Sequence, residues 1–187
     1  MQKAFEKIRA NVLVSSREED LSEADAIVLP GVGAFKEAAK KIELFKKVIY
    51  KQIEQKKPLL GICLGLQLLF TESTEGGLYR GLDILKGRIV HLPEGLKVPH
   101  MGWNAVRITD TANPLVEGLS REEYVYFVHS YYAEVKDRRN VVAFTEYGVD
   151  FPSIVAKKNL FATQFHPEKS GKTGLKILEN FLNYVRR

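Results

Sequence analysis

The only cysteine of the chain, Cys63, lies in the sequence GICLG between Gly61 and Gly65. An apolar stretch precedes it at Leu59–Ile62 and a helical pattern follows at Leu64–Phe70, which is the layout of a nucleophile elbow. The glycines allow a sharp turn from which the sulfur projects, and a helix N-terminus favours the thiolate over the thiol. Cys63 is therefore a candidate nucleophile, although the pentapeptide alone leaves open a buried structural cysteine.

A second candidate group is His166-Pro167-Glu168, which directly follows an apolar stretch at Leu160–Phe165. Residues two apart in an extended segment point to the same side, and Pro167 restricts both its own φ angle and the residue before it. An imidazole and a carboxylate held in this way are the base and the orienting group of a triad. In isolation they are more typical of a surface loop, but active sites gather where parallel strands end, and Cys63 is expected at the same edge.

The third segment is Pro30-Gly31-Val32-Gly33, after a strand predicted at Ala26–Leu29. A glycine-rich turn lets backbone N–H groups face a ligand. Gly31, Val32 and Gly33 could thus form an oxyanion hole, with the N–H of Leu64 as a second donor. Taken alone, this tetrapeptide is better explained as a plain turn. Together, the three segments predict acyl transfer or hydrolysis through a thioester, without indicating the substrate.

These segments must be positioned by a sheet, and the first half of the chain alternates between strand and helix patterns. The expected elements there are a helix at Met1–Arg9, strands at Val12–Val14, Ala26–Leu29 and Leu59–Ile62, a helical stripe from Phe35 to Ile49, and a buried helix at Leu64–Phe70. The second half has short strand patterns at Arg88–Leu92, Ala105–Thr109, Tyr124–His129, Val141–Thr145 and Ser153–Ala156, then Leu160–Phe165 and an amphipathic helix at Thr173–Arg186. We predict an α/β fold of a single domain spanning residues 1–187. It has a doubly wound, mostly parallel sheet with helices on both faces and an appended antiparallel section.

Composition excludes several classes of protein. The net charge is +5 and the pI about 9.2, but the lysines are scattered among glutamates, which is typical of solvated helix faces, so we expect no nucleic-acid partner. No apolar run approaches the ~18 residues of a membrane helix, and the N-terminal residues lack the apolar core of a signal peptide. We therefore expect a cytoplasmic protein without a membrane partner. A single cysteine permits no internal disulfide and no cysteine-based metal site, and we expect no metal or cofactor.

The motifs GICLGLQLLF at Gly61–Phe70, HPEK at His166–Lys169 and PGVG at Pro30–Gly33 together resemble those of the class I, or triad, glutamine amidotransferases. Within that family, PHMGWN at Pro99–Asn104 and YFVHSY at Tyr126–Tyr131 are similar to the glutaminase subunit of imidazole glycerol phosphate synthase, which acts in histidine biosynthesis. The resemblance runs along the whole chain. It implies hydrolysis of glutamine to glutamate and ammonia.

The resemblance also implies roles for matching positions. Cys63 corresponds to the nucleophile that attacks the glutamine amide, His166 to the base that protonates the departing ammonia, and Glu168 to the residue that holds the imidazole. The positions implied in substrate binding are Gly65, Gln67, Glu75, His129, Ser130 and Tyr131. Gly31, Val32, Gly33 and Leu64 correspond to the oxyanion site.

A partner is implied as well. The family subunit docks on a (βα)₈-barrel cyclase as a heterodimer and passes ammonia to it. The barrel makes imidazole glycerol phosphate and aminoimidazole carboxamide ribotide. Positions near the dock correspond to His100, Met101, Trp103, Asn104, Tyr126 and Lys169. Core packing is the competing explanation for Met101 and Trp103, and a satisfied core histidine is the competing explanation for His129.

One departure from the family pattern concerns the start. Relatives usually open with an apolar strand before the first helix, whereas this chain opens inside that helix, at Gln2-Lys3-Ala4-Phe5. We expect the first strand to be missing and its neighbours to lack ladder partners, which is costly for buried backbone groups. Either the true start lies upstream, or another element fills the gap.

Three other functions stay open. The chain could be a triad amidotransferase of another pathway, such as anthranilate, aminodeoxychorismate or pyridoxal phosphate synthesis, but PHMGWN speaks against this. It could be a catalytically silent binding module of the same fold, although all three triad residues are present. A cysteine peptidase is a further alternative, which Gln67 and Glu75 disfavour.

Overall fold

The computed structural model describes all residues from Met1 to Arg187. Its α-helices are α1 (Gln2–Lys7), α2 (Glu18–Glu23), α3 (Phe35–Glu43), α4 (Lys46–Glu54), α5 (Leu64–Leu68) and α6 (Gly171–Val185). Three short 3₁₀ turns lie at Pro114–Val116, Arg138–Asn140 and Pro167–Lys169. None of the helices combines the length and the apolar character that crossing a bilayer requires.

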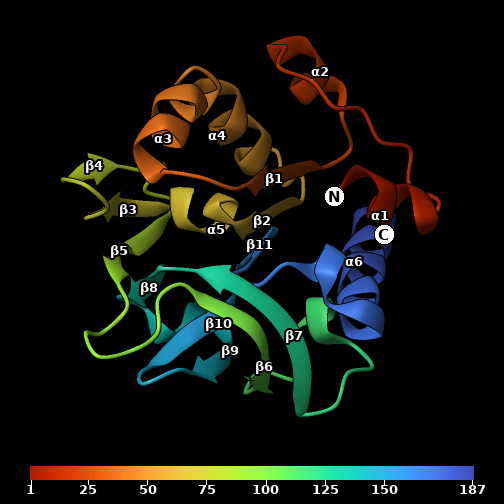
Figure 1. Ribbon diagram of the computed structural model, residues 1–187. Helices are drawn as coiled ribbons and strands as arrows, with labels where there is room; N and C mark the ends of the chain where they lie inside the picture. Colours follow the sequence, from red (N-terminus) through yellow and green to blue (C-terminus); the bar gives the residue numbers. More distant parts are fainter.

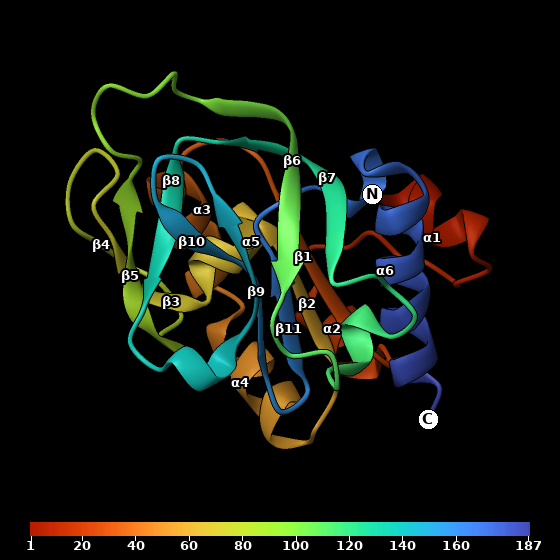
Figure 2. The ribbon, with the colours of Figure 1, turned by 90° about the horizontal axis from the view of Figure 1, so that it is seen from below.

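A seven-stranded sheet forms the centre of the molecule. Its strands are β1 (Ile27–Gly31), β2 (Leu59–Cys63), β11 (Leu160–Thr163), β10 (Asp150–Lys157), β9 (Val141–Glu146), β6 (His100–Ile108) and β7 (Glu122–His129), in this spatial order. The strands β1, β2 and β11 are parallel, and every pairing from β11 to β7 is antiparallel. Figure 2 shows β6 and β7 side by side at one end of this sheet.

A second sheet of four strands lies beside the first (Figure 2). It contains β4 (Tyr79–Arg80), β3 (Phe70–Ser73), β5 (Leu85–His91) and β8 (Tyr131–Val135), in that order. The chain passes directly from β7 into β8 at Ser130, so the segment between His129 and Tyr131 joins the two sheets.

Helices cover both faces of the large sheet, as predicted (Figure 1). On one face, Phe5 of α1 and Phe181 of α6 meet edge to face at 6.3 Å and pack with Phe161 of β11. On the other face, Phe35 of α3 and Ile49 of α4 are fully buried against the sheet. Burial of these two apolar layers supplies the main driving force that holds the strand ends in place.

The α/β class and the antiparallel section agree with the sequence-based prediction, but the description of the sheet as mostly parallel was wrong. Only β1, β2 and β11 run parallel, because no α-helix lies between β5 and β11, and β9, β10 and β11 follow one another through tight connections. Such connections force antiparallel pairing.

Two local predictions were also wrong. The strand expected at Val12–Val14 is absent: this segment has no neighbouring strand, and Leu13 and Val14 are 71% and 73% exposed. The stripe from Phe35 to Ile49 forms two helices rather than one, because the chain turns at Leu44, which is 72% exposed. The other predicted strands and helices are present with shifted ends, whereas α2, β3, β4 and β8 were not predicted.

Candidate active site

Cys63 ends β2 and precedes α5, so the predicted strand–turn–helix arrangement is present. Its backbone has φ 53° and ψ −107°, in a region that non-glycine residues rarely adopt. The side chain is 7% exposed, and its thiol donates a hydrogen bond to the carbonyl oxygen of Val128 at 3.7 Å. A strained, buried thiol at a strand end is the geometry expected of a nucleophile.

Close backbone packing explains the glycines around this turn. A Cβ atom on Gly65 would lie 1.7 Å from the carbonyl oxygen of Leu29, and one on Gly61 would lie 2.8 Å from the carbonyl oxygen of Gly65. Neither distance is compatible with a side chain. Packing alone therefore requires a glycine at position 65, because the absence of a side chain lets α5 lie directly against β1.

His166 follows β11 at the same edge of the sheet as Cys63, as predicted, but Pro167–Lys169 form a 3₁₀ turn rather than the expected extended segment. Its Nδ1 atom is 2.9 Å from Oε1 of Glu168, and the imidazole is buried. The hydroxyl of Ser170 donates to the His166 carbonyl at 2.7 Å, and the His166 backbone N–H donates to Tyr126 O at 3.0 Å. Hydrogen bonds therefore hold both the backbone of His166 and the Nδ1 atom of its ring. This leaves Nε2 as the nitrogen available for proton transfer.

The electrostatics of the pair match this role. Burial alone would lower the pKa of His166, but the nearby Cys63 and Glu168 outweigh it and raise that pKa to about 9. Burial would likewise raise the pKa of Glu168, but the hydrogen bond to His166 outweighs it and lowers that pKa. Nε2 itself has no well-formed hydrogen bond. The arrangement therefore favours an imidazolium beside the sulfur once the thiol proton has moved.

The predicted oxyanion loop is adjacent to the nucleophile. Gly31 is the direct register partner of Cys63 in the parallel β1–β2 pair, and a Cβ atom on Gly31 would lie 2.9 Å from Cβ of Leu64. Val32 is 80% exposed and Gly33 has φ 109°. The loop thus leaves the sheet next to the side chain of Leu64, and Gly31 and Leu64 are both neighbours of Cys63.

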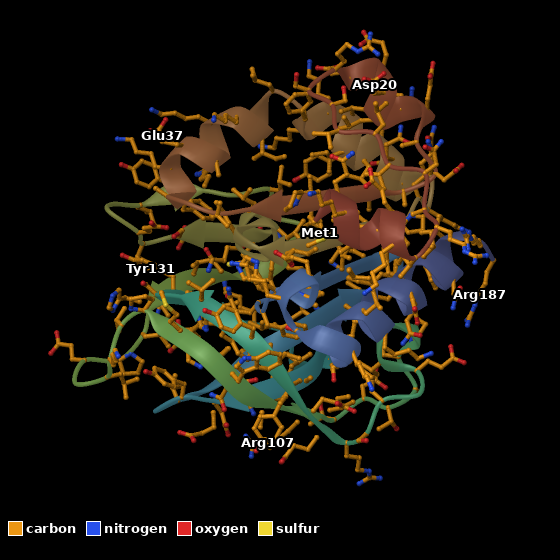
Figure 3. The ribbon with its side chains drawn as sticks, turned by 45° about the vertical axis from the view of Figure 1, so that its right-hand side comes forward. Met1, Asp20, Glu37, Arg107, Tyr131 and Arg187 are labelled. Carbon is orange, nitrogen blue, oxygen red and sulfur yellow. The ribbon has the colours of Figure 1, made fainter.

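The segment that joins the two sheets is held against α5. The side-chain amide of Gln67 donates to Tyr131 O at 3.0 Å, and His129 Nδ1 lies 2.9 Å from the same oxygen. The carbonyl of Ser130 accepts from Leu92 N at 2.9 Å. Tyr131 lies on the opposite side of the molecule from Arg187 (Figure 3). The backbone predicted to hold the substrate is thus itself held by α5 and the loop after β5.

Glu75 is tied to the oxyanion loop rather than to the nucleophile. Its Oε2 atom accepts from the backbone N–H of Phe35 at 3.0 Å, at the first residue of α3. Ala34, which precedes that helix, provides no side-chain cap. Glu75 therefore replaces the missing cap of the helix that follows Gly33.

His129 and His100 form a buried pair. His129 Nδ1 must donate to the Tyr131 carbonyl, so its Nε2 accepts from His100 Nδ1 at 2.9 Å. The Nε2 atom of His100 then accepts from Asn104 Nδ2 at 3.3 Å. Burial lowers the pKa of His129 to about 3 and that of His100 to about 4. Both rings are therefore neutral, and His129 is a satisfied core histidine.

The predicted partner-facing residues separate into exposed and buried ones. Trp103 and Met101 are 57% and 61% exposed, which excludes core packing for both. Trp103 meets Tyr126 edge to face at 6.1 Å, and Lys169 Nζ lies 5.8 Å from the centre of the Tyr126 ring. His100, by contrast, is buried and only lines an open depression of about 560 Å³ beside Trp103.

Two residues of the site were missed by sequence reasoning. Ser170 joins the carbonyl of His166 to the backbone N–H of Tyr126. Gln164 is fully buried, and its amide nitrogen lies 3.8 Å from the Cys63 sulfur. Gln164 lies two residues before His166, in the bend that follows β11, and the only signal for it in the sequence is a polar residue within an apolar stretch. No group of three or more His, Cys, Asp and Glu side chains is arranged to hold a metal ion.

Comparison with known proteins also indicates a glutamine amidotransferase. The model of the family Glutamine amidotransferase class-I matches residues 2–185. A protein of Archaeoglobus fulgidus named Imidazole glycerol phosphate synthase subunit HisH is 53% identical over 188 residues, covering 100% of this chain and 93% of that protein. The protein of the same name from Methanocaldococcus jannaschii is 48% identical over 185 residues, covering 99% and 93%.

The fold has solved counterparts. A structure described as a crystal structure of glutamine amidotransferase superposes with a TM-score of 0.77 at 19% identity, covering 100% of this chain and 92% of the other. The glutaminase domain of Trypanosoma brucei CTPS superposes with a TM-score of 0.68 at 16% identity, covering 97% and 86%. At these identities the solved structures support only the fold. The family model and the similar sequences support membership of the family. The chain belongs to the class-I glutamine amidotransferase family.

Proposed function

We propose that this chain is the glutaminase subunit of an imidazole glycerol phosphate synthase. It hydrolyses glutamine to glutamate and ammonia and supplies the ammonia to a cyclase subunit in histidine biosynthesis. The relatives that carry this subunit's name reach 53% identity over the whole chain. The observation that carries the chemistry is the position of His166, fixed by Glu168 at 2.9 Å, at the same sheet edge as the buried Cys63.

The reaction begins at the thiol. Cys63 gives its proton to Nε2 of His166, and the thiolate attacks the side-chain carbonyl carbon of glutamine, so that a C–S bond forms and the carbonyl oxygen becomes an oxyanion. Backbone N–H groups of the Gly31–Gly33 loop and of Leu64 stabilise that oxyanion. When the intermediate collapses, the C–N bond breaks and His166 returns its proton to the departing ammonia.

Water completes the cycle. His166 takes a proton from water as the hydroxide attacks the thioester, and collapse of the second intermediate breaks the C–S bond and releases glutamate. The thiolate then recovers a proton from His166. Glu168 holds the ring throughout, with Nδ1 protonated and Nε2 directed to the reacting atoms.

Substrate positioning falls to residues of α5 and of the segment that joins the two sheets. We assign glutamine binding to Gly65, Gln67, Glu75, His129 and the backbone of Ser130 and Tyr131. The hydrogen bonds that fix Tyr131 O support this assignment. Preorganised backbone groups of this kind lower the entropic cost of orienting a small substrate.

The partner in this proposal is a (βα)₈-barrel cyclase, bound as a heterodimer in the cytoplasm. The exposed pair Trp103 and Met101, next to Tyr126 and Lys169, provides an aromatic and cationic anchor of the type that dominates protein interfaces. His100 and Asn104 line the depression beside this anchor.

The test is glutamate release from glutamine by the purified chain, alone and with a cyclase barrel and its nucleotide ligand. We expect little release alone and a large rise in the complex. Cys63→Ala should abolish the release while leaving binding to the barrel unchanged. Substantial glutamate release by that variant would contradict the mechanism, and activation by the partner of another pathway instead of the cyclase would contradict the assignment to histidine biosynthesis.

A further inference from the structure

Gln164 contacts the Cys63 sulfur, yet no step of the proposed reaction uses it. It is fully buried just after β11, two residues before His166, and its backbone N–H donates to Ser153 O at 2.9 Å. Burying a side-chain amide is costly unless its donors and acceptor find partners. The partners of this amide are therefore informative about what it does.

The orientation of the amide follows from a fixed carbonyl. Tyr131 O can only accept, so the atom of Gln67 that lies 3.0 Å from it is the amide nitrogen. The same nitrogen has a second hydrogen, and it donates to Oε1 of Gln164 at 3.3 Å. Nε2 of Gln164 is consequently the end that faces the Cys63 sulfur, at 3.8 Å.

The sulfur thus has two contacts of opposite character. Val128 O is an acceptor at 3.7 Å and suits the thiol, which has a hydrogen to donate. Gln164 is a donor and suits the thiolate, which has only lone pairs to offer. After the proton has moved to His166, the contact with Val128 loses its hydrogen, whereas the contact with Gln164 becomes a charge-assisted hydrogen bond.

We propose that Gln164 is a further catalytic residue of the glutaminase reaction, on which this inference rests: its side-chain amide donates to the Cys63 thiolate. The hydrogen bond holds the sulfur before the C–S bond forms and stabilises it again when that bond breaks at the end of thioester hydrolysis. Gln164 exchanges no proton with the sulfur. Gln67 is the positioning residue that keeps the donor directed at it.

The test uses the fact that Cys63 is the only thiol of the chain. The rate of alkylation by iodoacetamide is measured by mass spectrometry as a function of pH, because the midpoint reports the thiolate and the plateau reports access. In Gln164→Met, which removes the donor at similar length, we expect the midpoint to rise by about one pH unit. An unchanged midpoint in the folded variant would overturn the proposal.

The ionisable groups near the sulfur are the same in both chains. They are His166, which interacts with Cys63, and Glu168 and the neutral His129, which interact with His166, so a difference between the profiles isolates the amide. Gln52→Met serves as the matched control. Gln52 is a buried glutamine on α4 whose Oε1 has no hydrogen-bond partner, and its replacement should leave the midpoint in place.

A second measurement needs no variant. In the ¹⁵N-labelled chain, the side-chain amide protons of Gln164 should shift with the same midpoint as the alkylation profile. Amide protons that stay constant through that pH range would overturn the proposal, even if Gln164→Met did not fold.

Turnover gives an independent check. With glutamine and the partner present, Gln164→Met should lower kcat about tenfold or more while KM changes much less, because the hydrogen bond acts on the sulfur and not on bound glutamine. An unchanged kcat would count against the proposal. Alkylation and NMR require no substrate, so a chain that failed to hydrolyse glutamine but showed both shifts would refute the proposed function and leave the Gln164–Cys63 hydrogen bond established.

Discussion

The carboxylate of Glu75 accepts a hydrogen bond from the backbone N–H of Phe35 at 3.0 Å, between residues that are 40 positions apart in the sequence. This contact fixes the first turn of α3 directly after the Gly31–Gly33 loop. A residue proposed to bind substrate is thus also the cap of the helix that positions the oxyanion donors. Occupation of the site and order in that loop are therefore linked through one carboxylate.

Replacing Glu75 with alanine should have two effects. The free energy of unfolding should fall by about 1 kcal/mol, the usual cost of losing a helix cap, and KM for glutamine should rise. Urea denaturation and steady-state glutaminase assays measure the two quantities. Glu37→Ala is the control, because Glu37 is an exposed residue of the first turn of α3 that pairs only with Lys40. Equal stabilities of the two variants would refute the capping role.

Stability should also depend on the protonation of His166. Its pKa in the folded chain is raised to about 9 from the ordinary 6.5, so the folded state binds this proton more tightly than the unfolded state does. The resulting stabilisation is complete below pH 6.5 and is lost as the pH rises through 9. The lowered pKa of Glu168 has the opposite sense: its contribution is present above the ordinary value of 4.5 and is lost in acid.

Urea unfolding of the wild type and of His166→Gln at several pH values tests this linkage. The stability difference between the two chains should shrink between pH 6.5 and 9. A difference that stays constant over that range would show that the imidazole gains no proton affinity on folding.

The turn around Cys63 should tolerate no side chain at Gly65. A methyl group there would lie 1.7 Å from Leu29 O, so Gly65→Ala should lose about 3 kcal/mol or more, or fail to fold. Gly76→Ala is the control, since Gly76 has φ 64° and nothing within 4 Å of the added carbon, and it should lose only about 1 kcal/mol. Similar losses in both variants, measured by thermal or urea unfolding, would refute the packing argument.

Trp103 should contribute to the partner interface and not to the fold. Because it is 57% exposed, Trp103→Ala should leave the unfolding free energy within about 0.5 kcal/mol and weaken binding to a cyclase barrel by about 30-fold or more. Isothermal titration calorimetry measures the affinity. Tyr124→Ala, at another exposed aromatic residue that is 60% exposed, should bind normally. An unchanged affinity for Trp103→Ala would place the interface elsewhere.

The three segments of the candidate site could be predicted from the sequence because each of them lies at the end of a strand. Placing Cys63, His166 and Gly31 together needs only the rule that parallel strands end at one edge, and the structure has them there. That rule fixes neither side-chain partners nor the pairing of strands across the second half of the chain. The antiparallel share of the large sheet was therefore underestimated.

Contacts made through tertiary structure escaped prediction for a physical reason. Gln164 reads as one polar residue in an apolar strand, and only the approach of α5 gives its amide a partner in Gln67. The strand β8 directly follows β7, so no turn residues separate the two strands in the sequence. Val12–Val14 has strand propensity but no neighbour to pair with, and propensity alone does not make a strand.

These 187 residues contain one cysteine. Thiol oxidation can therefore act on this chain only at the sulfur of Cys63. A sulfenic acid formed on its sulfur ends turnover, and no second cysteine in the described chain is present to convert it into a protective disulfide. Recovery then depends on a reductant from solution that is small enough to reach a sulfur only 7% exposed. The flow of nitrogen through the proposed complex is thereby sensitive to oxidants at one buried position.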